Sequence, residues 1–569
     1  MNGTQWIIFI LIIQVIHFLG TWKLYVKAGR KAWEAAIPIY NAIVLMQIIN
    51  RPKWWVFLLF IPIINLLMFP VIWVETIRSF GRNNLMESWL VVLTLGFYVY
   101  YVNYALDVKY IEERSLHPKT AMGEWVSSIV FAIVAATLVH TYFIQPYVIP
   151  TGSLEKTLRI GDFLFVSKFH YGARTPMTTV AAPMVHDTIP GLGIRSYLNK
   201  PQLPYFRLPG FKKIKRNEIV VFSWPADTVR VFFKKEKGVK KPIDKKSNYV
   251  KRCVGVPGDS LAVINGYVHI NGRQTILPDR AMPQYDYMAY SQKGVSSKLL
   301  KELGVTDFNR IYITSQLNQN QFDQISKYLL GSRRGNSGNI ELITNYLGIP
   351  TKAIRSAGLS LKEQTDRRRS LTITDDLAEK LNNNAAIDSV VKTLEPKGEK
   401  GYNIFPQHNS YAWNNDNFGP IYIPEKGKTV PLNLEVLPVY KKIIKDYEGN
   451  VIAVNGNQIS INGDLTETYT FKQDYYWMMG DNRDHSEDSR TWGFVPENHI
   501  VGTPIFIWMS IDNFKAGWRN WEIRWDRVFT TVHGNGEPIS YFKYFLIALA
   551  GWFAFDFFRR KKKKTDSSK

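Results

Sequence analysis

The chain contains a single cysteine, Cys253, among its 569 residues. One cysteine excludes an intramolecular disulfide framework and any zinc site built from several thiolates. Acidic residues are also scarce: 48 Asp and Glu stand against 71 Lys and Arg, which gives a formal net charge of +23. Disorder and a collagen-like repeat are excluded as well, because 46% of the residues are hydrophobic and 14% are aromatic. The length favours about three or four domains.

Long apolar runs are missing from the middle of the chain and concentrated at its two ends. Crossing about 30 Å of hydrocarbon takes about 20 mostly apolar residues in a helix. We predict membrane-spanning helices in five such segments: residues 6–22, 54–74, 85–104, 125–144 and 541–558. Residues 35–50 form a shorter run interrupted by Pro38, which favours a re-entrant or interfacial helix.

The distribution of Lys and Arg predicts the orientation of these helices, because short basic loops stay in the cytoplasm. Residues 23–53 carry six basic residues, and the six residues 559–564 directly after the last apolar run are all basic. Both segments are therefore predicted to be cytoplasmic. With five spans, residues 146–540 then face the outside. Arg78 and Arg82 lie on the unfavoured side in this arrangement.

The large outer segment is predicted to be mostly β. Short β-branched and aromatic runs at residues 219–224 and 249–256 are bounded by Pro, Gly and Asn, as strands are. Two hairpin signals with Asn-Gly turns, at residues 263–272 and 454–463, favour type I′ geometry. Their similarity reflects either shared turn chemistry or an internal repeat.

The character of the sequence changes between residues 280 and 410. Helical periodicity recurs at residues 297–303, 320–330, 339–347 and 376–394, with polar, Asn-rich joints between these runs. We predict a partly helical subdomain inserted into the β domain. It contains no catalytic motif, so we expect it to be dispensable for the chemistry.

Three short stretches of the outer segment can hold chemistry. The first follows the fourth apolar run and reads PYVIPTGSLEKTLRIGD over residues 146–162. Ser153, which follows a glycine in an extended Pro-rich stretch, can be approached closely by a substrate backbone and is the candidate nucleophile. A serine nucleophile needs a base, and the histidines of the sequence form no recognisable serine–histidine–aspartate set.

A lysine can act as the base when burial lowers its pKa. The second stretch, NYVKRCVGVPGD, offers Lys251, whose neighbours on the same strand face are Tyr249 and Cys253. Lys156 is the rival base, because Ser153-Leu-Glu-Lys156 matches the S-x-x-K pattern of penicillin-recognising enzymes. The S-D-N and K-T-G companions of that pattern do not occur in the sequence.

The third stretch is YYWMMGDNRDHSEDSRTWGFVP over residues 475–496, a run of strand-forming aromatics followed by a turn dense in charged groups. Asp488 and Arg490 can form a bidentate pair that holds this turn. Ser486 can orient a nearby amine through a hydrogen bond. On composition alone, a charged and solvated turn explains the stretch equally well.

In this order, and after an apolar helix, the three stretches resemble bacterial type I signal peptidase, a membrane-bound serine protease with a Ser–Lys dyad. The matching motifs are P-T-G-S ending at Ser153, R-x-x-I-V-V-F from Arg216, K-R-x-V-G-x-P-G-D from Lys251 and G-D-N-R-D-x-S-x-D-S-R from Gly480. The resemblance covers about residues 150–272 and 410–510. Residues 280–410 lie outside it.

The resemblance implies Ser153 as the nucleophile and Lys251 as the general base, without a metal or a cofactor. It also implies supporting residues: the Ser153 amide and the Thr151 hydroxyl as oxyanion donors, Ser486 as the group that positions Lys251, and Asp488 and Arg490 as structural supports. Two positions depart from the family pattern. Leu154 and Lys156 stand where Met and Pro are usual, and Asn217-Glu218 stands where Gly-Asp is usual.

The implied reaction removes N-terminal signal peptides from exported preproteins at the outer face of the bacterial cytoplasmic (inner) membrane. The implied partners are preprotein signal peptides and membrane lipids, near the secretion machinery and without nucleic acid. The implied protein is multi-pass, with its catalytic domain facing the periplasm or the cell exterior. Two alternatives stay open: a polytopic transport or scaffold protein with an inactive peptidase-like ectodomain, and a penicillin-recognising acyltransferase.

The expected fold class is a multi-span α-helical membrane region plus a mostly β extracytoplasmic catalytic domain, signal-peptidase-like, with a partly helical insertion. The expected segments follow the chain: a multi-span membrane module (1–123), a transmembrane anchor (124–145), the first segment of the catalytic domain (146–279), the insertion (280–410), the second segment of the catalytic domain (411–540), a C-terminal transmembrane helix (541–558) and a basic cytoplasmic tail (559–569).

Overall fold

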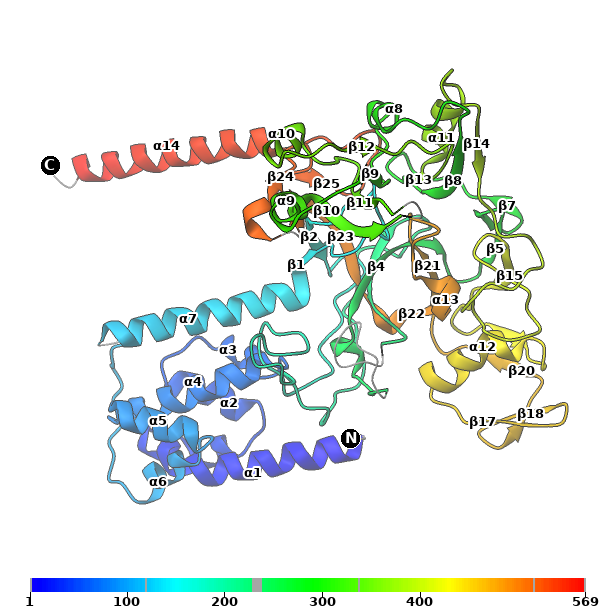
Figure 1. Cartoon of the computed structure of the whole chain (residues 1–569). Helices are drawn as coiled ribbons and strands as arrows, with labels where there is room; N and C mark the ends of the chain where they lie inside the picture. Colours follow the sequence, from blue (N-terminus) through cyan, green and yellow to red (C-terminus); the bar gives the residue numbers. More distant parts are fainter. Residues whose placement is uncertain (1–2, 118–119, 228–237, 336–337, 515–516, 567–569) are drawn as a thin grey trace.

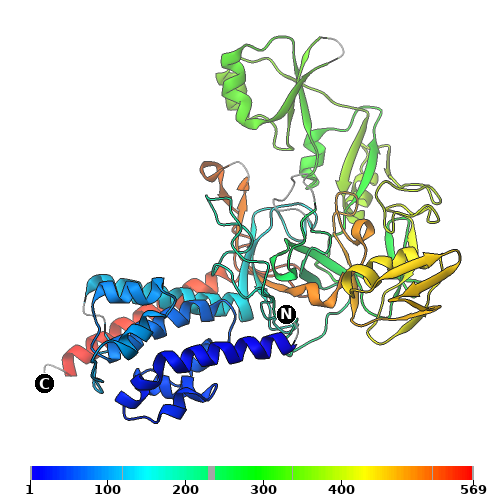
Figure 2. The same cartoon turned by 90° about the horizontal axis from the view of Figure 1, so that it is seen from below.

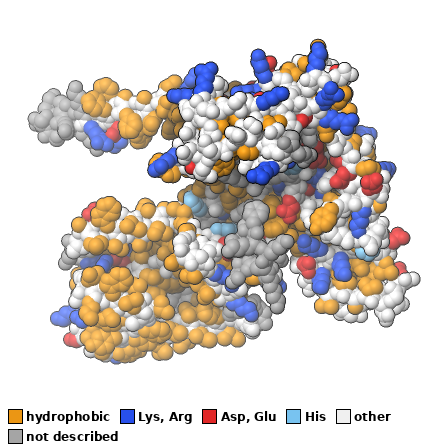
Figure 3. Space-filling view, in the orientation of Figure 1, with side chains coloured by type: hydrophobic (Ala, Val, Ile, Leu, Met, Phe, Trp, Pro, Cys, Tyr) orange, Lys and Arg blue, Asp and Glu red, His pale blue; other side chains and the backbone are white. Residues whose placement is uncertain are grey.

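The computed structural model describes the whole chain except residues 1–2, 118–119, 228–237, 336–337, 515–516 and 567–569, with side chains described to Arg560. Its helical and β regions occupy opposite sides of the molecule (Figure 1). Apolar side chains cover the visible face of the N-terminal helices and much of the C-terminal helix, whereas the β region carries many charged groups (Figure 3).

The N-terminal region is a group of helices with one long helix at each end. In chain order these are α1 (Gly3–Lys27), η1 (Ala32–Ala35), α2 (Tyr40–Ile48), α3 (Trp55–Leu58), α4 (Ile64–Ser79), α5 (Leu85–Leu93), α6 (Tyr98–Tyr104), α7 (Ala121–Leu138) and η2 (Val139–Phe143). Within the described residues, two helices are long and apolar enough to cross a membrane: Thr4–Lys27 and Ala121–Phe143. The first helix contains the first predicted span, and the second contains the fourth except for its last residue, Ile144.

The second and third predicted spans are not continuous helices. Residues 54–74 break between α3 and α4, where Pro62 cannot donate a helical hydrogen bond and Ile63 takes a left-handed φ of 71°. Residues 85–104 are divided into α5 and α6, which are bent by 117°. Two left-handed residues, Leu95 (φ 52°) and Gly96 (φ 88°), make that bend.

The last predicted span lies, except for Tyr541, within α14 (Phe542–Asp566), a continuous helix that also includes most of the basic tail. Lys543, Asp556 and Arg559 interrupt its apolar character. For this reason α14 is not among the two helices of the described chain that have both the length and the hydropathy of a span.

The central sheet of the β domain combines strands from both catalytic segments of the chain. Its path is β1-β2-β23-β3-β4-β21-β22, all antiparallel, and β24 and β25 also pair with β23. The bounds are Ile144–Val148 (β1), Asp162–Ser167 (β2), Ile219–Ser223 (β3), Asn248–Gly255 (β4), Tyr475–Met479 (β21), Val495–Pro496 (β22), Ile500–Asp512 (β23), Glu522–Ile523 (β24) and Thr530–Thr531 (β25). The strands predicted at 219–224 and 249–256 are confirmed as β3 and β4.

Smaller sheets and a helix form a second lobe around a core that includes Trp477 and Phe494. Its elements are β5 (Ser260–Ile264), β6 (Tyr267–Ile270), β7 (Arg273–Gln274), β15 (Phe418–Tyr422), β16 (Thr429–Pro431), α12 (Leu437–Lys442), η5 (Ile443–Tyr447), β17 (Ile452–Asn455), β18 (Gln458–Ile461), β19 (Asp464–Leu465) and β20 (Thr468–Thr470). Both predicted hairpins are confirmed, as β5–β6 and β17–β18. Asn265 and Gly266 have the positive φ values, 51° and 83°, of a type I′ turn.

The insertion is an α/β subdomain with two antiparallel sheets, one nested in the sequence of the other. The outer sheet, β13-β8-β14, is joined to α8 and α11, and the inner sheet, β10-β11-β9-β12, to α9 and α10. The bounds are Tyr285–Tyr290 (β8), Ser297–Glu302 (α8), Arg310–Thr314 (β9), Gln319–Ile325 (α9), Leu329–Arg334 (β10), Ile340–Thr344 (β11), Thr351–Ser356 (α10), Lys362–Glu363 (β12), Arg368–Ile373 (β13), Asp375–Asn382 (α11) and Ser389–Lys392 (β14). The inner sheet and its helices project away from the rest of the molecule (Figure 2).

The helices predicted in the insertion are only partly correct. The one at 297–303 is confirmed as α8, but 320–330 and 376–394 each contain a shorter helix followed by a strand. The helix predicted at 339–347 is wrong, because this segment is strand β11. Leu342 and Thr344 are buried there at a spacing of two residues and pair with β9. A short apolar run does not reliably distinguish the residue period of a strand from that of a helix.

Candidate active site

Ser153 lies in the turn that connects β1 to β2. Leu154 and Leu158, which follow it, are buried in an apolar cluster with Ile149 and fix the turn against the sheet. Ser153 itself is only partly buried. Its backbone N–H has no acceptor among the residues that the structure describes. The turn of the candidate nucleophile is therefore held by packing, while the residue itself keeps part of its surface exposed.

Lys251 lies on β4, and only 2% of its surface is exposed. Its Nζ donates a hydrogen bond to Ser486 Oγ at 3.0 Å and lies 5.7 Å from the centre of the Tyr249 ring. Burial lowers the pKa of Lys251 to about 8; the nearby Asp488 carboxylate opposes this change and Arg490 adds to it. A buried lysine with this pKa is neutral for a useful fraction of the time near neutral pH.

Gly480 is the point at which the three stretches meet. A Cβ placed on Gly480 would lie 2.5 Å from the Ser153 carbonyl oxygen and 2.2 Å from Ser486 Oγ. Both distances are shorter than real contacts of a Cβ, so no side chain fits in this space. Ser486 Oγ also accepts the hydrogen bond from Lys251 and therefore links the amine of Lys251 to the space beside the Ser153 carbonyl.

Asn482 connects the third stretch directly to the turn that carries Ser153. Its backbone N–H donates to the Ser153 carbonyl oxygen at 3.1 Å, and its Nδ2 donates to the Gly152 carbonyl oxygen at 3.2 Å. These two bonds fix the main chain on the carbonyl side of Ser153. The sequence prediction did not include Asn482, although the residue is part of the Gly-Asp-Asn-Arg motif.

Two buried ion pairs stabilise the third stretch. Asp488 and Arg490 form the predicted bidentate contact at 3.0 and 2.9 Å, and Asp488 Oδ2 also accepts the Gly480 N–H at 3.0 Å. Asp481 pairs in the same way with Arg252, the neighbour of Lys251, at 2.7 and 2.6 Å. The second pair, absent from the prediction, joins the loop to β4. Buried pairs with this geometry hold a loop in one conformation.

The rival base, Lys156, points elsewhere. Its Nζ donates to Thr306 Oγ1 in the insertion at 2.6 Å. Its backbone has a left-handed φ of 68°. Burial lowers its pKa as well, whereas the nearby Glu155 opposes the change. Thr151, the predicted second oxyanion donor, is exposed two residues before Ser153.

The insertion contacts the candidate site where its first strand begins. Gln284 donates through its N–H to Asp481 O at 2.7 Å and accepts from the Arg483 N–H at 2.9 Å. The Asp286 N–H donates to Asp484 Oδ2 at 2.7 Å. These contacts argue against the expectation that the whole insertion can be removed without effect.

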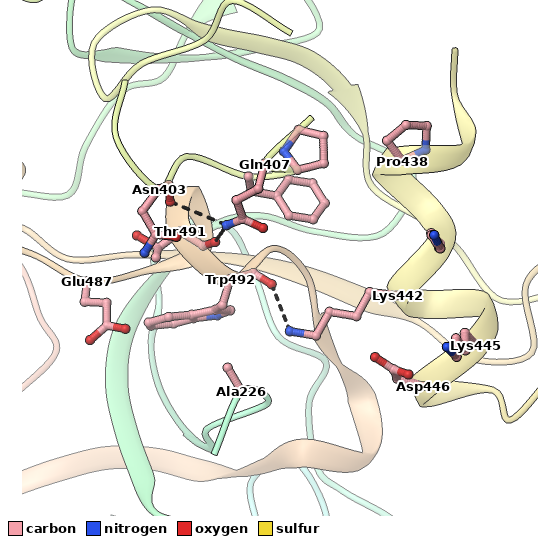
Figure 4. A pocket seen from close by; sticks show the side chains of 13 residues that line it. Ala226, Asn403, Gln407, Pro438, Lys442, Lys445, Asp446, Glu487, Thr491 and Trp492 are labelled. Carbon is pink, nitrogen blue, oxygen red and sulfur yellow. Dashed lines mark hydrogen bonds between the residues drawn. The ribbon is translucent and has the colours of Figure 1, made fainter. Parts of the chain in front are cut away.

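A groove of about 520 Å³ adjoins the third stretch (Figure 4). Its lining includes Asn403, Gln407, Lys442, Glu487 and Trp492. Neither Ser153 nor Lys251 lines it. Among the described residues, no group of three or more His, Cys, Asp and Glu could hold a metal ion.

Comparison with known proteins assigns this arrangement to a class. Curated relatives named Signal peptidase I are 22–29% identical to the chain over 157 to 431 aligned residues. The chain is accordingly a serine protease, a hydrolase. It belongs to the signal peptidase family, peptidase S26, whose family model matches residues 122–337 and 426–509, more than half of the chain. A second family model, of unknown function (DUF5684), matches residues 33–113.

Three of these relatives show how far the similarity extends. Signal peptidase I of Buchnera aphidicola subsp. Acyrthosiphon pisum (strain APS) is 24% identical over 424 residues, which are 73% of this chain and 87% of the relative. The Haemophilus influenzae protein is 22% identical over 431 residues, 74% of this chain and 79% of the relative. The Rickettsia massiliae protein is 29% identical over 157 residues, 27% of this chain and 45% of the relative.

The structure bears on two positions that depart from the family pattern, Asn217 and Lys156. It explains the first and shows the backbone conformation at the second. Asn217, where Gly is usual, has a φ of 67°, a conformation that Asn tolerates better than most residues. Lys156, where Pro is usual, has a φ of 68°, which the proline ring forbids. The turn after Ser153 therefore has a backbone conformation that a proline at this position could not adopt.

Proposed function

We propose that this chain is a signal peptidase I that cleaves preproteins with a Ser153–Lys251 dyad. The observation that carries the proposal is the placement of Lys251: a buried amine with a pKa of about 8, bonded to Ser486, at the space around Gly480 that also adjoins Ser153. A buried base beside a serine that is accessible to a substrate is the arrangement that amide hydrolysis without histidine requires.

In the proposed mechanism, neutral Lys251 accepts the Ser153 hydroxyl proton while Ser153 Oγ attacks the scissile carbonyl. The Ser153 N–H, which has no acceptor among the described residues, and the Thr151 hydroxyl donate to the oxyanion. Protonated Lys251 then gives its proton to the leaving amine. A water molecule, deprotonated by Lys251, then attacks the acyl-enzyme, and Lys251 returns this proton to the departing Ser153 Oγ, which frees the product acid and restores the neutral amine. Ser486 keeps the amine in position, and Asp488 with Arg490 holds the loop of Ser486.

The stretches before Ser153 and Lys251 lie side by side and suggest where the substrate lies. Tyr147 on β1 accepts a hydrogen bond from Asn248 Nδ2 on β4 at 3.2 Å. Ile149 and Val250 pack in the same apolar cluster. We infer that an extended substrate segment lies along these two stretches, with its main chain hydrogen-bonded as an added strand.

The test of the function is cleavage of a preprotein by the full chain in proteoliposomes. Ser153→Ala is expected to lower the rate by about 10⁴-fold or more, because it removes the nucleophile. The folded variant should still bind the preprotein. If Ser153→Ala cleaves at the wild-type rate, another group is the nucleophile and the dyad is wrong. If the wild type is inactive in this assay, the inactive-ectodomain alternative gains support. Stable acylation of Ser153 by benzylpenicillin would instead favour the acyltransferase.

We further propose that the protein is anchored in the cytoplasmic membrane through α1, α7 and α14, with the β domain outside, where preproteins leave the secretion machinery. The amino end of α1, the carboxyl end of α7 and the amino end of α14 all lie toward the β domain in both views (Figures 1 and 2). This common direction agrees with cytoplasmic placement of residues 23–53 and of the basic tail.

Residues 54–79 and 85–104 are proposed to re-enter the membrane from the cytoplasmic side instead of crossing it. Glu75, near the end of α4, pairs with Arg51 before α3, at 2.9 Å, and with Arg114 in the loop before α7. The start and the end of residues 54–79 therefore lie at the same depth relative to the membrane. Lys23 lies 4.7 Å from the centre of the Tyr104 ring, so α6 also ends at the cytoplasmic end of α1. Arg78 and Arg82 are then cytoplasmic, as their charge favours.

Cysteine labelling distinguishes this topology from five spans. The native Cys253 is buried, so the background is low. Lys298→Cys, whose side chain is 86% exposed, is expected to react with an impermeant reagent in intact cells. Asn83→Cys and Asp107→Cys are expected to react only after permeabilisation. Labelling of Asn83→Cys from outside would show that residues 54–74 cross the membrane and would overturn the re-entrant arrangement.

The two nested sheets of the insertion are expected to differ in how much preprotein cleavage depends on them. Tyr312 on β9 pairs with Glu363 on β12, so the ends of the inner segment are adjacent and a short linker can replace residues 310–363. This deletion leaves β8 and its contacts intact and retains the hydrogen bond from Lys156 to Thr306. Preprotein cleavage is therefore expected to fall by less than about tenfold.

Deleting residues 285–405 is the contrasting variant. It removes Asp286 and also Phe405, which is buried with its ring 5.8 Å from that of Trp477. Loss of a buried Phe costs about 3–5 kcal/mol of stability. This variant is expected to lose both its cooperative thermal transition and its activity. A folded and active protein would show that the contacts of the insertion do not support the site.

A further inference from the structure

A small cavity lies where the β domain meets the outer end of α7. Its volume is about 110 Å³, room for a few water molecules or one phosphate group. Its lining combines residues of the helical region with residues of the β domain, among them Ile63, Thr141, Lys168, Arg174, Asp244 and Lys245. Ile63 is the left-handed residue that ends the α3–α4 break, so the N-terminal module contributes to the cavity directly.

Lys168 is the residue of the cavity whose amine has no partner among the described residues. Its backbone N–H donates to the Phe143 carbonyl oxygen at 2.8 Å, which places Lys168 at the last residue of the candidate span Ala121–Phe143. No side chain or carbonyl in the described part of the chain accepts a hydrogen bond from its Nζ. Burial lowers the pKa of Lys168 to about 7, and the nearby Arg174 lowers it further. Lys168 is half-buried, and a partly desolvated ammonium without a hydrogen-bond acceptor is unfavourable.

Asp244 supplies one negative charge to the lining, against the three basic residues Lys168, Arg174 and Lys245. The Asp244 carboxylate already accepts from the Thr178 N–H at 2.9 Å and the Thr178 hydroxyl at 2.8 Å, and from the Met177 N–H at 3.1 Å. Arg174 donates to Asn498 O at 3.0 Å, and Lys245 donates to Val185 O at 3.4 Å. Both of these acceptors are uncharged carbonyls, so the cavity has an excess of positive charge.

We propose that this cavity binds a phosphate group, supplied by a phospholipid headgroup or by free phosphate. The reasons are the excess of cations around one small space, the unpartnered Lys168 amine and the position at the end of α7. Phosphates are the abundant anions at the depth where a membrane helix ends. The placement of α7 in the membrane is part of the proposed function, whereas the phosphate chemistry of the cavity is independent of it.

The experiment measures binding, not cleavage. The full chain is purified in mild detergent from membranes that contain phosphatidylglycerol, and retained phospholipid is counted by native mass spectrometry. Lys168→Met is expected to reduce retention by about tenfold, because it removes the charged partner without leaving a hole. Lys168→Arg is expected to restore it. Lys298→Met removes an exposed lysine of the insertion as the matched control and should retain phospholipid like the wild type.

A second arm identifies the source of the phosphate. The delipidated chain is titrated with inorganic phosphate and, separately, with phosphatidylglycerol vesicles. Binding of the vesicles alone that depends on Lys168 supports a headgroup site, and binding of inorganic phosphate that depends on Lys168 supports a free-phosphate site. The proposal is overturned if neither binds, or if Lys168→Met and Lys298→Met bind equally. It is also overturned if Lys168→Met changes only the KM for the preprotein, since the cavity then belongs to the substrate path.

Discussion

Replacing Lys251 with Met is expected to abolish preprotein cleavage while the fold is retained. Met has nearly the length of the lysine and no charge, so it fills the buried site without leaving an unpaired ion. The reaction loses the buried base that is bonded to Ser486, and the expected loss in kcat is about 10⁴-fold or more. A fluorogenic signal-peptide substrate gives kcat and KM, and thermal unfolding confirms the fold.

The matched control is Lys156→Met. Lys156 is also a lysine with a lowered pKa, but its amine is bonded to Thr306 in the insertion, whereas that of Lys251 is bonded to Ser486. Its replacement is expected to cost less than tenfold, roughly 1.4 kcal/mol of barrier. If Lys156→Met loses activity and Lys251→Met keeps it, the S-x-x-K alternative is correct and the proposed dyad is wrong.

The same assignment predicts the pH dependence of the wild type. Lys251 must be neutral to accept a proton, and an amine is neutral above its pKa. Because that pKa is lowered to about 8, kcat/KM should rise with pH and level off above about 8. For an unperturbed lysine, kcat/KM would continue to rise up to a pH of ~10.4. A rise that extends to this higher pH would show that the base is not buried when the substrate reacts.

The sequence predicted the chemical groups better than their surroundings. Long motifs point to Ser153, Lys251 and Ser486 as the proposed nucleophile, base and positioning hydroxyl, because these roles require particular residue types. The contact of Gln284 with Asp481 could not be predicted, since it joins segments about 200 residues apart in the chain. No periodicity or composition reports which distant loops meet.

The membrane module shows a second limit of sequence patterns. Hydropathy identifies residues 54–74 as long and apolar enough to cross, but it does not report a left-handed residue such as Ile63. The sequence signal that bears on this point is the unfavoured side of Arg78 and Arg82 in the five-span arrangement. Both become cytoplasmic in the proposed re-entrant arrangement. The contacts of Glu75 with Arg51 and Arg114 support that proposal, because they bring the end of α4 close to the start of α3.

Gly480→Ala is expected to reduce cleavage by about 10²–10³-fold, since a displacement near 1 Å in an active site has that effect. The new methyl group would lie 2.5 Å from the Ser153 carbonyl oxygen and 2.2 Å from Ser486 Oγ. The carbonyl is main chain and is held by the Asn482 N–H, so it cannot turn away as a flexible side chain can. The turn of Ser153 and the loop of Ser486 must therefore move apart.

The kinetic parameters separate this effect from simple unfolding. We expect kcat to fall while KM changes little, together with a loss of about 1–3 kcal/mol in the free energy of unfolding from overpacking. Gly331→Ala on β10 is the control, because its Cβ would meet no atom within 4 Å, and it should leave both quantities unchanged. If Gly480→Ala keeps the wild-type kcat, then Ser153 and Ser486 do not act across the space at Gly480, and the proposed arrangement of nucleophile and base is wrong.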